Sequence, residues 1–140
     1  MKDWDYQMRI VLSSESAEKA RISMKDPSIA ELFAVLQKHH AKLKCQFDAF
    51  AEYVAEAERV GADKYPLYKW TKATIEEPSK KEKYLKSFTV YIEDNHVYSK
   101  QKAELLELDL QLIKSRQYIL GISKYDTNPV NNPQIPKQYL

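Results

Sequence analysis

Apolar residues recur at alternating spacings of four and three positions over the stretch from 29 to 57. The series, which includes one histidine, is Ile29, Phe33, Leu36, His40, Leu43, Phe47, Phe50, Val54 and Ala57. This spacing is typical of a coiled-coil seam or of one face of a long helix. It predicts a helix over about 29–60, which ends before Gly61 because glycine adopts left-handed backbone without steric cost.

A second apolar pattern runs from 84 to 120 and predicts another long helix, over about 80–120 and closed by Gly121. Leucine and isoleucine dominate its second half, where they cover more of the circumference than the roughly 100° stripe that one neighbour requires. Such a width predicts at least two neighbours, one of which is either the N-terminal region or a second copy of the chain. We therefore expect a homo-oligomer.

Both predicted helices begin with the same short motif, Pro-Ser-x-x-Glu, at 27–31 and at 78–82. In a capping box of this kind the serine, Ser28 or Ser79, accepts a hydrogen bond from the amide three residues later. The glutamate of the motif reaches back to the serine amide. The repeated motif therefore predicts two helix starts, although it is common to unrelated proteins and carries no functional information.

Two further segments, 4–12 and 88–98, fit a strand and a helix almost equally well. In the first, apolar residues alternate with polar ones, and in the second, β-branched and aromatic residues flank an Asp-Asn pair that favours a hairpin turn. A lone strand needs a partner edge, so the two segments are strands together or not at all. We favour a helix over 88–98. Between the two segments, Ser13 or Ser14 predicts the start of a short helix that ends before Pro27.

These features predict a mainly α fold, in which a long antiparallel helical hairpin lies in a helical bundle. A short N-terminal helix, an N-terminal strand as the alternative for 4–12, and an extended C-terminal tail complete it. We expect one helical domain over 1–122, followed by the tail 123–140, whose three prolines exclude regular structure. The apolar residues Ile135, Tyr139 and Leu140 predict that this tail lies along the domain or along a partner as an extended arm.

The charge and cysteine content narrow the environment of the protein. With 22 basic and 20 acidic residues among 140, the net charge of +2 does not by itself indicate a nucleic-acid or membrane partner. The single cysteine cannot form an internal disulfide, which favours a cytoplasmic location. No segment approaches the ~20 apolar residues that span a bilayer, so we expect a soluble protein with no membrane partner.

Few residues suggest catalysis or metal binding. With only two glycines, the chain has no glycine-rich loop for phosphates. On the predicted helix, His39, His40 and Cys45 do not converge on one face, whereas a zinc site needs three or four converging ligands. We therefore expect no catalytic residue, no cofactor and no metal, and a protein that is not an enzyme.

The predicted function is protein–protein interaction or assembly, as in an adaptor or a chaperone-like bundle. The apolar helix faces and the C-terminal arm would bind a protein partner, including a second copy of the chain. The alternative is a weak nucleic-acid-binding protein, because the region 63–86 mixes lysines with aromatic rings that can stack on bases. The candidate partner-binding residues in this region are Tyr65, Tyr68, Lys69, Trp70 and Lys72.

Overall fold

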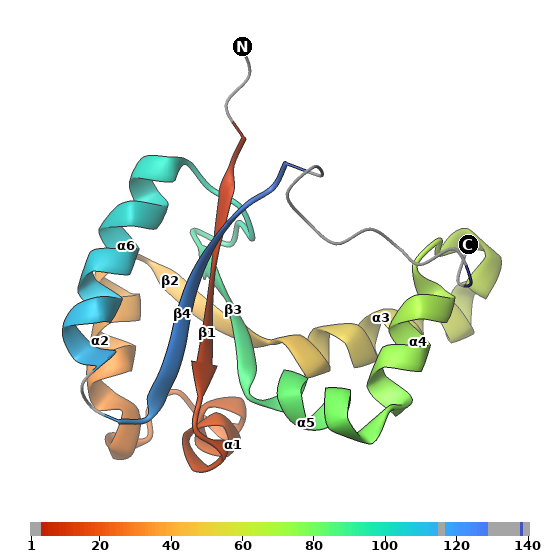
Figure 1. Cartoon of the computed structure of the whole chain (residues 1–140), viewed down its shortest axis with the longest axis horizontal. Coiled ribbons are helices and arrows are strands. Elements are labelled where there is room, and N and C mark those ends of the chain that lie inside the picture. Colours follow the sequence, from red (N-terminus) through yellow and green to blue (C-terminus); the bar gives the residue numbers. More distant parts are fainter. Residues whose placement is uncertain (1–3, 115–116, 129–137, 139–140) are drawn as a thin grey trace.

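A four-stranded antiparallel sheet forms the centre of the molecule in the computed structural model, which describes residues 4–114, 117–128 and 138 (Figure 1). The strands are β1 (Tyr6–Leu12), β2 (Ala41–Cys45), β3 (Ser87–Ile92) and β4 (Ile119–Asp126), in the order β2-β3-β1-β4. The helices are α1 (Ser14–Ile22), α2 (Ala30–Lys38), α3 (Gln46–Val60), α4 (Tyr68–Glu76), α5 (Pro78–Leu85) and α6 (Lys100–Ile113). Two short 3-10 helices lie at Pro27–Ile29 and Ala62–Lys64.

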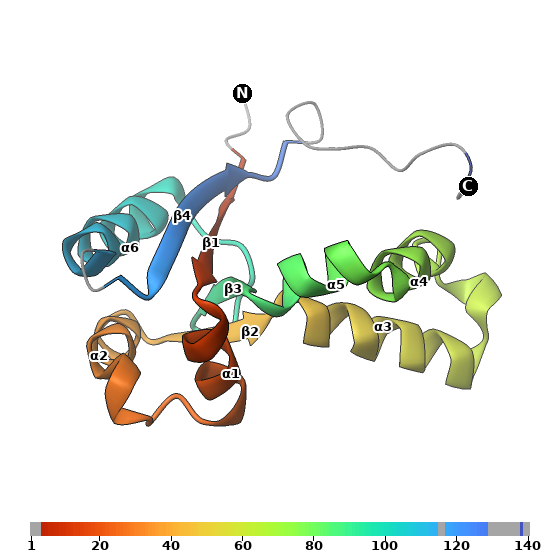
Figure 2. The same ribbon diagram turned by 60° about the horizontal axis from the view of Figure 1, so that its bottom comes forward.

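The connections interleave two strand–helix–strand units. One unit runs from β1 through α1 and α2 to β2, and the other runs from β3 through α6 to β4. Because β1 and β3 are the central pair, the arrangement is that of a split βαβ fold. The connection from β2 to β3 holds α3, α4 and α5, which form a helical lobe. Figures 1 and 2 both show α2 and α6 on one side of the sheet and this lobe on the other.

The core lies between the sheet and the pair α2 and α6. Successive side chains of a strand point to opposite faces, so the buried residues Met8 and Ile10 of β1 face the same helices as Phe88, Val90 and Ile92 of β3. The helices contribute Leu32, Leu36, Ala103, Leu106 and Leu110, all of which are buried. One sheet face is therefore covered by apolar packing, and the other face is not covered by these helices.

Tyr98 fastens the two central strands from within the core. Its hydroxyl accepts a hydrogen bond from the Met8 amide at 2.8 Å and donates one to the Val90 carbonyl at 2.8 Å. Its own backbone exchanges two hydrogen bonds with Tyr6, at 2.7 and 2.9 Å. Burial raises the pKa of the hydroxyl to about 12, because the charged phenolate would lose its hydration. The hydroxyl therefore stays protonated and bridges the Met8 amide and the Val90 carbonyl.

The predicted helix over 29–60 is wrong in its middle. The chain ends α2 at Lys38, turns at His40 with a positive φ of 52°, and then forms β2 before α3 begins. The regular apolar spacing comes from two separate helices, α2 and α3. Their apolar positions happen to continue the same three-and-four spacing across the turn and β2. The edge strand between them is fixed by long-range pairing, in which Leu43 lies opposite Val90. The predicted end is confirmed, since Gly61 follows α3 with a φ of 140°.

The predicted helix over 80–120 is also wrong. The stretch 80–120 instead forms most of α5, β3, α6 and the start of β4. Gly121 lies inside β4 rather than beyond a helix. The strand alternative for 4–12 and for part of 88–98 is confirmed, because β1 and β3 pair with each other. The fold is thus α/β, and neither a helical bundle nor a coiled coil is present among the described residues.

The helix caps differ in detail from those predicted. Asp26 rather than Ser28 caps the short helix before α2, and Glu77 rather than Ser79 caps α5. Each carboxylate accepts a hydrogen bond from the serine amide two residues later, at 2.9 and 3.2 Å respectively. The short N-terminal helix is confirmed as α1, with Ser13 as its cap. Residues 123–126 of the predicted tail form the second half of β4, whereas Ile135, Tyr139 and Leu140 lie outside the described residues.

A charge cluster joins the two helices that cover the core. His39 Nε2 lies 2.6 Å from Asp109 Oδ2, and Lys38 Nζ lies 3.0 Å from the same oxygen. The hydrogen bond from His39 and then that from Lys38 lower the pKa of the Asp109 carboxyl below its usual value. Lowering the pKa of the folded state stabilises the fold above the unfolded-state value of about 3.9. This contribution is lost as the pH falls through the lowered pKa.

We expect Asp109→Asn to reduce the free energy of unfolding by roughly 1 kcal/mol at pH 7, because it removes the charge from a partly buried cluster. Urea unfolding at a series of pH values measures the effect, and the difference from wild type should shrink below about pH 4. Asp94→Asn is the control, since Asp94 is 85% exposed. A difference that stays constant down to pH 2 would contradict the role of the Asp109 charge.

Candidate functional site

The face of the sheet turned away from α2 and α6 carries polar, basic and aromatic side chains. On β1, Arg9 alternates with the buried Met8 and Ile10, and on β4, Tyr125 lies on the same face as Arg9. The register places Arg9 opposite Thr89 of β3 and Ser123 of β4. A half-exposed sheet face of this kind gives a rigid platform, because each side chain is held at a fixed strand position.

The helical lobe closes this platform on one side and leaves a hollow of about 520 Å³. Its floor comes from β1, β3 and β4, and its other wall comes from α3, α4 and α5. The lining side chains with polar or aromatic groups are Arg9, Gln46, Trp70, Lys83, Tyr84, Ser87, Ser123 and Tyr125. The hollow therefore brings together residues from the two ends of the described chain and from its middle.

Two cations and three aromatic rings give the hollow its chemistry. The Arg9 guanidinium lies 4.4 Å from the centre of the Tyr125 ring, and its Nε donates a 2.6 Å hydrogen bond to Gln7 Oε1. The Lys83 ammonium lies 5.2 Å from the centre of the Tyr84 ring. Within the part of the chain that the structure describes, no carboxylate lines the hollow, and none forms an ion pair with Arg9 or Lys83. The hollow is therefore suited to an anion that also carries flat rings.

The sequence-predicted residues of α4 do not act together. Only Trp70 lines the hollow. Tyr68 and Lys72 instead bind Glu58 of α3, at 2.9 and 3.2 Å, and these hydrogen bonds lower the pKa of the Glu58 carboxyl. This cluster ties α4 to α3 and satisfies both side chains within the lobe.

Of the remaining predicted residues, Tyr65 packs edge-on against Tyr53, with ring centres 5.4 Å apart, and Lys69 is exposed. The predicted region 63–86 does contain Lys83 and Tyr84, which line the hollow. Sequence reasoning missed Arg9 and Tyr125. A signal for both lay in strand alternation, which places each on the polar face of its own strand.

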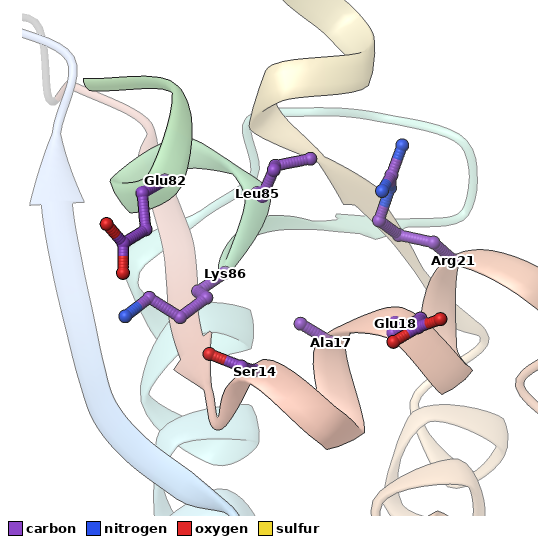
Figure 3. A pocket seen from close by; sticks show the side chains of 7 residues that line it. All are labelled: Ser14, Ala17, Glu18, Arg21, Glu82, Leu85 and Lys86. Atoms are coloured by element: carbon purple, nitrogen blue, oxygen red, sulfur yellow. The ribbon is translucent and has the colours of Figure 1, made fainter. Parts of the chain in front are cut away.

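A smaller hollow of about 270 Å³ lies between α1 and α5 and has less distinctive chemistry. Figure 3 shows Ala17 and Leu85 at its centre, with Glu82 and Lys86 pointing to one side and Glu18 and Arg21 on the other. Arg21 is already engaged, because it binds Asp48 of α3 through two hydrogen bonds of 2.7 and 2.9 Å. Mixed charges that point apart do not select one ligand class, so this hollow is not the candidate site.

The described residues offer neither a metal-binding cluster nor a reactive thiol. Among the described residues, no group of three or more His, Cys, Asp or Glu side chains lies close enough to hold a metal ion. Cys45 is buried at the end of β2, and burial raises the pKa of its thiol, which disfavours the reactive thiolate. None of the helices in the described part of the chain has the length and apolar character that crossing a membrane requires.

Comparison with known proteins does not add to this picture, because no family model, no curated protein and no solved structure matches the chain. The site is therefore interpreted from its geometry and charge alone.

Proposed function

We propose that the protein binds single-stranded nucleic acid in the hollow between the sheet and the helical lobe. The observation that carries the proposal is the pair of cations, Arg9 and Lys83, set among the rings of Trp70, Tyr84 and Tyr125 with no carboxylate in the lining described. Cations contact phosphates, and aromatic rings stack on bases whatever their sequence. A strand with unpaired bases offers both groups at once.

The geometry favours a single strand over a duplex. A duplex keeps its base faces stacked inside the helix, so rings in a hollow cannot reach them. The platform presents its side chains from three antiparallel strands, which lets successive nucleotides meet different strands of the sheet. The proposed site includes part of the region 63–86, for which nucleic-acid binding was the alternative prediction, and adds residues of β1 and β4.

The test compares charge-neutralised variants in a binding titration. Fluorescein-labelled 12-nucleotide oligo(dT) and oligo(U) are titrated with wild type and with the double variant Arg9→Gln/Lys83→Gln, followed by anisotropy at 50 to 300 mM salt. We expect the variant to bind roughly tenfold more weakly. Its log–log salt slope should fall by about 1.4, because each phosphate contact to a single strand contributes about 0.7.

The matched control is Lys25→Gln/Lys114→Gln, which removes two exposed positive charges that do not line the hollow. It should change the affinity less than twofold. The proposal is overturned if wild type does not bind either strand at 50 mM salt, or if the control pair weakens binding as much as the Arg9/Lys83 pair.

A second candidate function, self-association through α6, rests on a different observation. Leu105, Leu108 and Leu112 are 52%, 65% and 78% exposed and follow each other at helical spacings of three and four. They lie on the side of α6 opposite the buried Leu106 and Leu110. Gln101 extends the same stripe, which is thus uncharged along its length. An antiparallel copy of α6 would meet this stripe without opposing like charges.

Light scattering after size exclusion at two concentrations tests this second candidate. Wild type should approach the mass of a dimer as its concentration rises, and Leu108→Glu should remain monomeric because it places a charge at the centre of the stripe. Gln111→Glu adds the same charge beside the stripe and should still dimerise. A wild type that stays monomeric at millimolar concentration would exclude the dimer.

A further inference from the structure

A pocket of about 170 Å³, smaller than the two hollows described above, opens within the helical lobe beside the larger hollow. Its walls are Phe50 of α3, Leu67, Trp70, Thr71 and Thr74 at α4, and Tyr84 of α5. We propose that this pocket receives one unstacked nucleobase of the bound strand. The inference rests on the proposed function and adds to it a defined base-binding position.

The pocket lies next to the cation-lined hollow and shares two wall residues with it. Trp70 and Tyr84 line both spaces. Lys83 precedes Tyr84 in α5, and its ammonium lies 5.2 Å from the Tyr84 ring. A base that enters the pocket thus keeps its own phosphate beside a cation. This neighbouring cation favours a nucleotide over an uncharged aromatic ligand.

The walls have the shape and polarity that suit a flat heteroaromatic ring. The rings of Phe50 and Tyr84 meet edge-on at 5.0 Å and an angle of 77°, which fixes the Tyr84 ring as one wall. Thr74 Oγ1 donates a 2.8 Å hydrogen bond to the Trp70 carbonyl, so its proton is already used. The Thr71 hydroxyl has no hydrogen-bond partner among the described residues and can donate to or accept from a base edge.

The volume limits what can enter. Pockets that hold drug-sized ligands measure roughly 300–1,000 Å³, and the lobe pocket is smaller than these. One base fits this scale, whereas two stacked bases or an extended peptide segment do not. The remaining nucleotides of the strand therefore stay in the larger hollow, on the platform formed by the sheet.

The fluorescence of Trp70 reports a base stacked on its indole, and Thr71, which lines the pocket but not the hollow, assigns that base to the pocket. The chain has two tryptophans, so Trp4→Phe leaves Trp70 as the only tryptophan, whose emission is excited selectively at the red edge of the protein absorption band. Titration of this variant with 12-nucleotide oligo(dT) should quench Trp70 in a saturable way, because stacking brings the base against the indole. A 12-nucleotide strand built only of abasic sites carries the same phosphates and should bind without quenching.

Thr71→Val in the same background tests the hydroxyl, since valine keeps the shape of threonine and removes its hydrogen bond. Quenching by oligo(dT) should then require roughly fivefold more strand, as expected for one hydrogen bond. Thr127→Val, beyond the end of β4, is the matched control and should leave the titration unchanged. Thermal melts of both variants check that the fold is retained.

The outcomes separate the two proposals. If oligo(dT) binds with the Arg9 and Lys83 dependence and quenches Trp70, but Thr71→Val leaves the titration unchanged, the pocket inference is wrong and the proposed function stands. If neither strand binds, the proposed function fails and the inference fails with it. If the abasic strand quenches Trp70 as strongly as oligo(dT), the pocket senses the backbone or a change of the lobe, and the inference is likewise overturned.

Discussion

Replacing Phe88 by alanine is expected to reduce the free energy of unfolding by about 3–5 kcal/mol, the largest effect that we expect for one substitution among the described residues. Phe88 is the largest of the fully buried side chains in the described part of the chain, with 1% exposure. It lies on the central strand β3 and points to the face that the helices cover. Its removal leaves a cavity that the surrounding strands cannot fill by small shifts. Urea unfolding followed by circular dichroism measures the loss.

Tyr91→Ala provides the control that separates the observed strand from the predicted helix. On a helix, Phe88 and Tyr91 are three residues apart and share a face, whereas on β3 they point to opposite faces of the sheet. Tyr91 is only partly buried, so its loss should cost no more than about 1 kcal/mol. Comparable losses for both variants would contradict the strand.

Replacing Tyr98 by phenylalanine is the second large effect that we expect, at roughly 2 kcal/mol. The change removes one oxygen and leaves two buried backbone groups, the Met8 amide and the Val90 carbonyl, without their 2.8 Å partners. Unsatisfied buried groups of this kind cost about 1–3 kcal/mol. The ring itself stays in place, so the loss comes from hydrogen bonding rather than from a cavity.

Hydrogen exchange locates the effect of Tyr98→Phe. The Met8 amide should exchange much faster in the variant, while amides of α2 change only as far as the global stability falls. Tyr91→Phe is the matched control, because Tyr91 lies on the other face of the sheet, and it should remain within about 0.5 kcal/mol of wild type. Unaltered protection of Met8 would mean that its amide finds another partner.

The sequence contains the local signals for several elements but not the pairing that decides the rest. Ser13 and Gly61 mark a helix start and a helix end correctly, because caps depend on neighbouring residues alone. The segment Ala41–Cys45 has helix-forming residues and becomes a strand because β3 pairs with it. Tertiary pairing overrides weak propensity in such short segments.

The candidate site was only partly predictable for the same reason. Lys83 and Tyr84 line the hollow and belong to the region 63–86, whose lysines and rings predicted nucleic-acid binding as the alternative function. Arg9 and Tyr125 join them only because β1 pairs with β4, with Arg9 opposite Ser123 and Gln7 opposite Tyr125. No local pattern reveals a contact between such distant parts of a single sequence. Tyr68 and Lys72, which the composition favoured, are satisfied by Glu58 within the lobe.

The central position of the first strand bears on how the chain is made. During synthesis β1 emerges before the other three strands, but its two neighbours in the sheet, β3 and β4, lie far downstream. The Met8 amide can form its hydrogen bond only after the Tyr98 hydroxyl, 90 positions later, has been made. A nascent or shortened chain that lacks β4 therefore carries an unprotected strand edge that can pair with other chains. Folding should be slow for a domain of this size, because distant segments must meet before any of the sheet is complete.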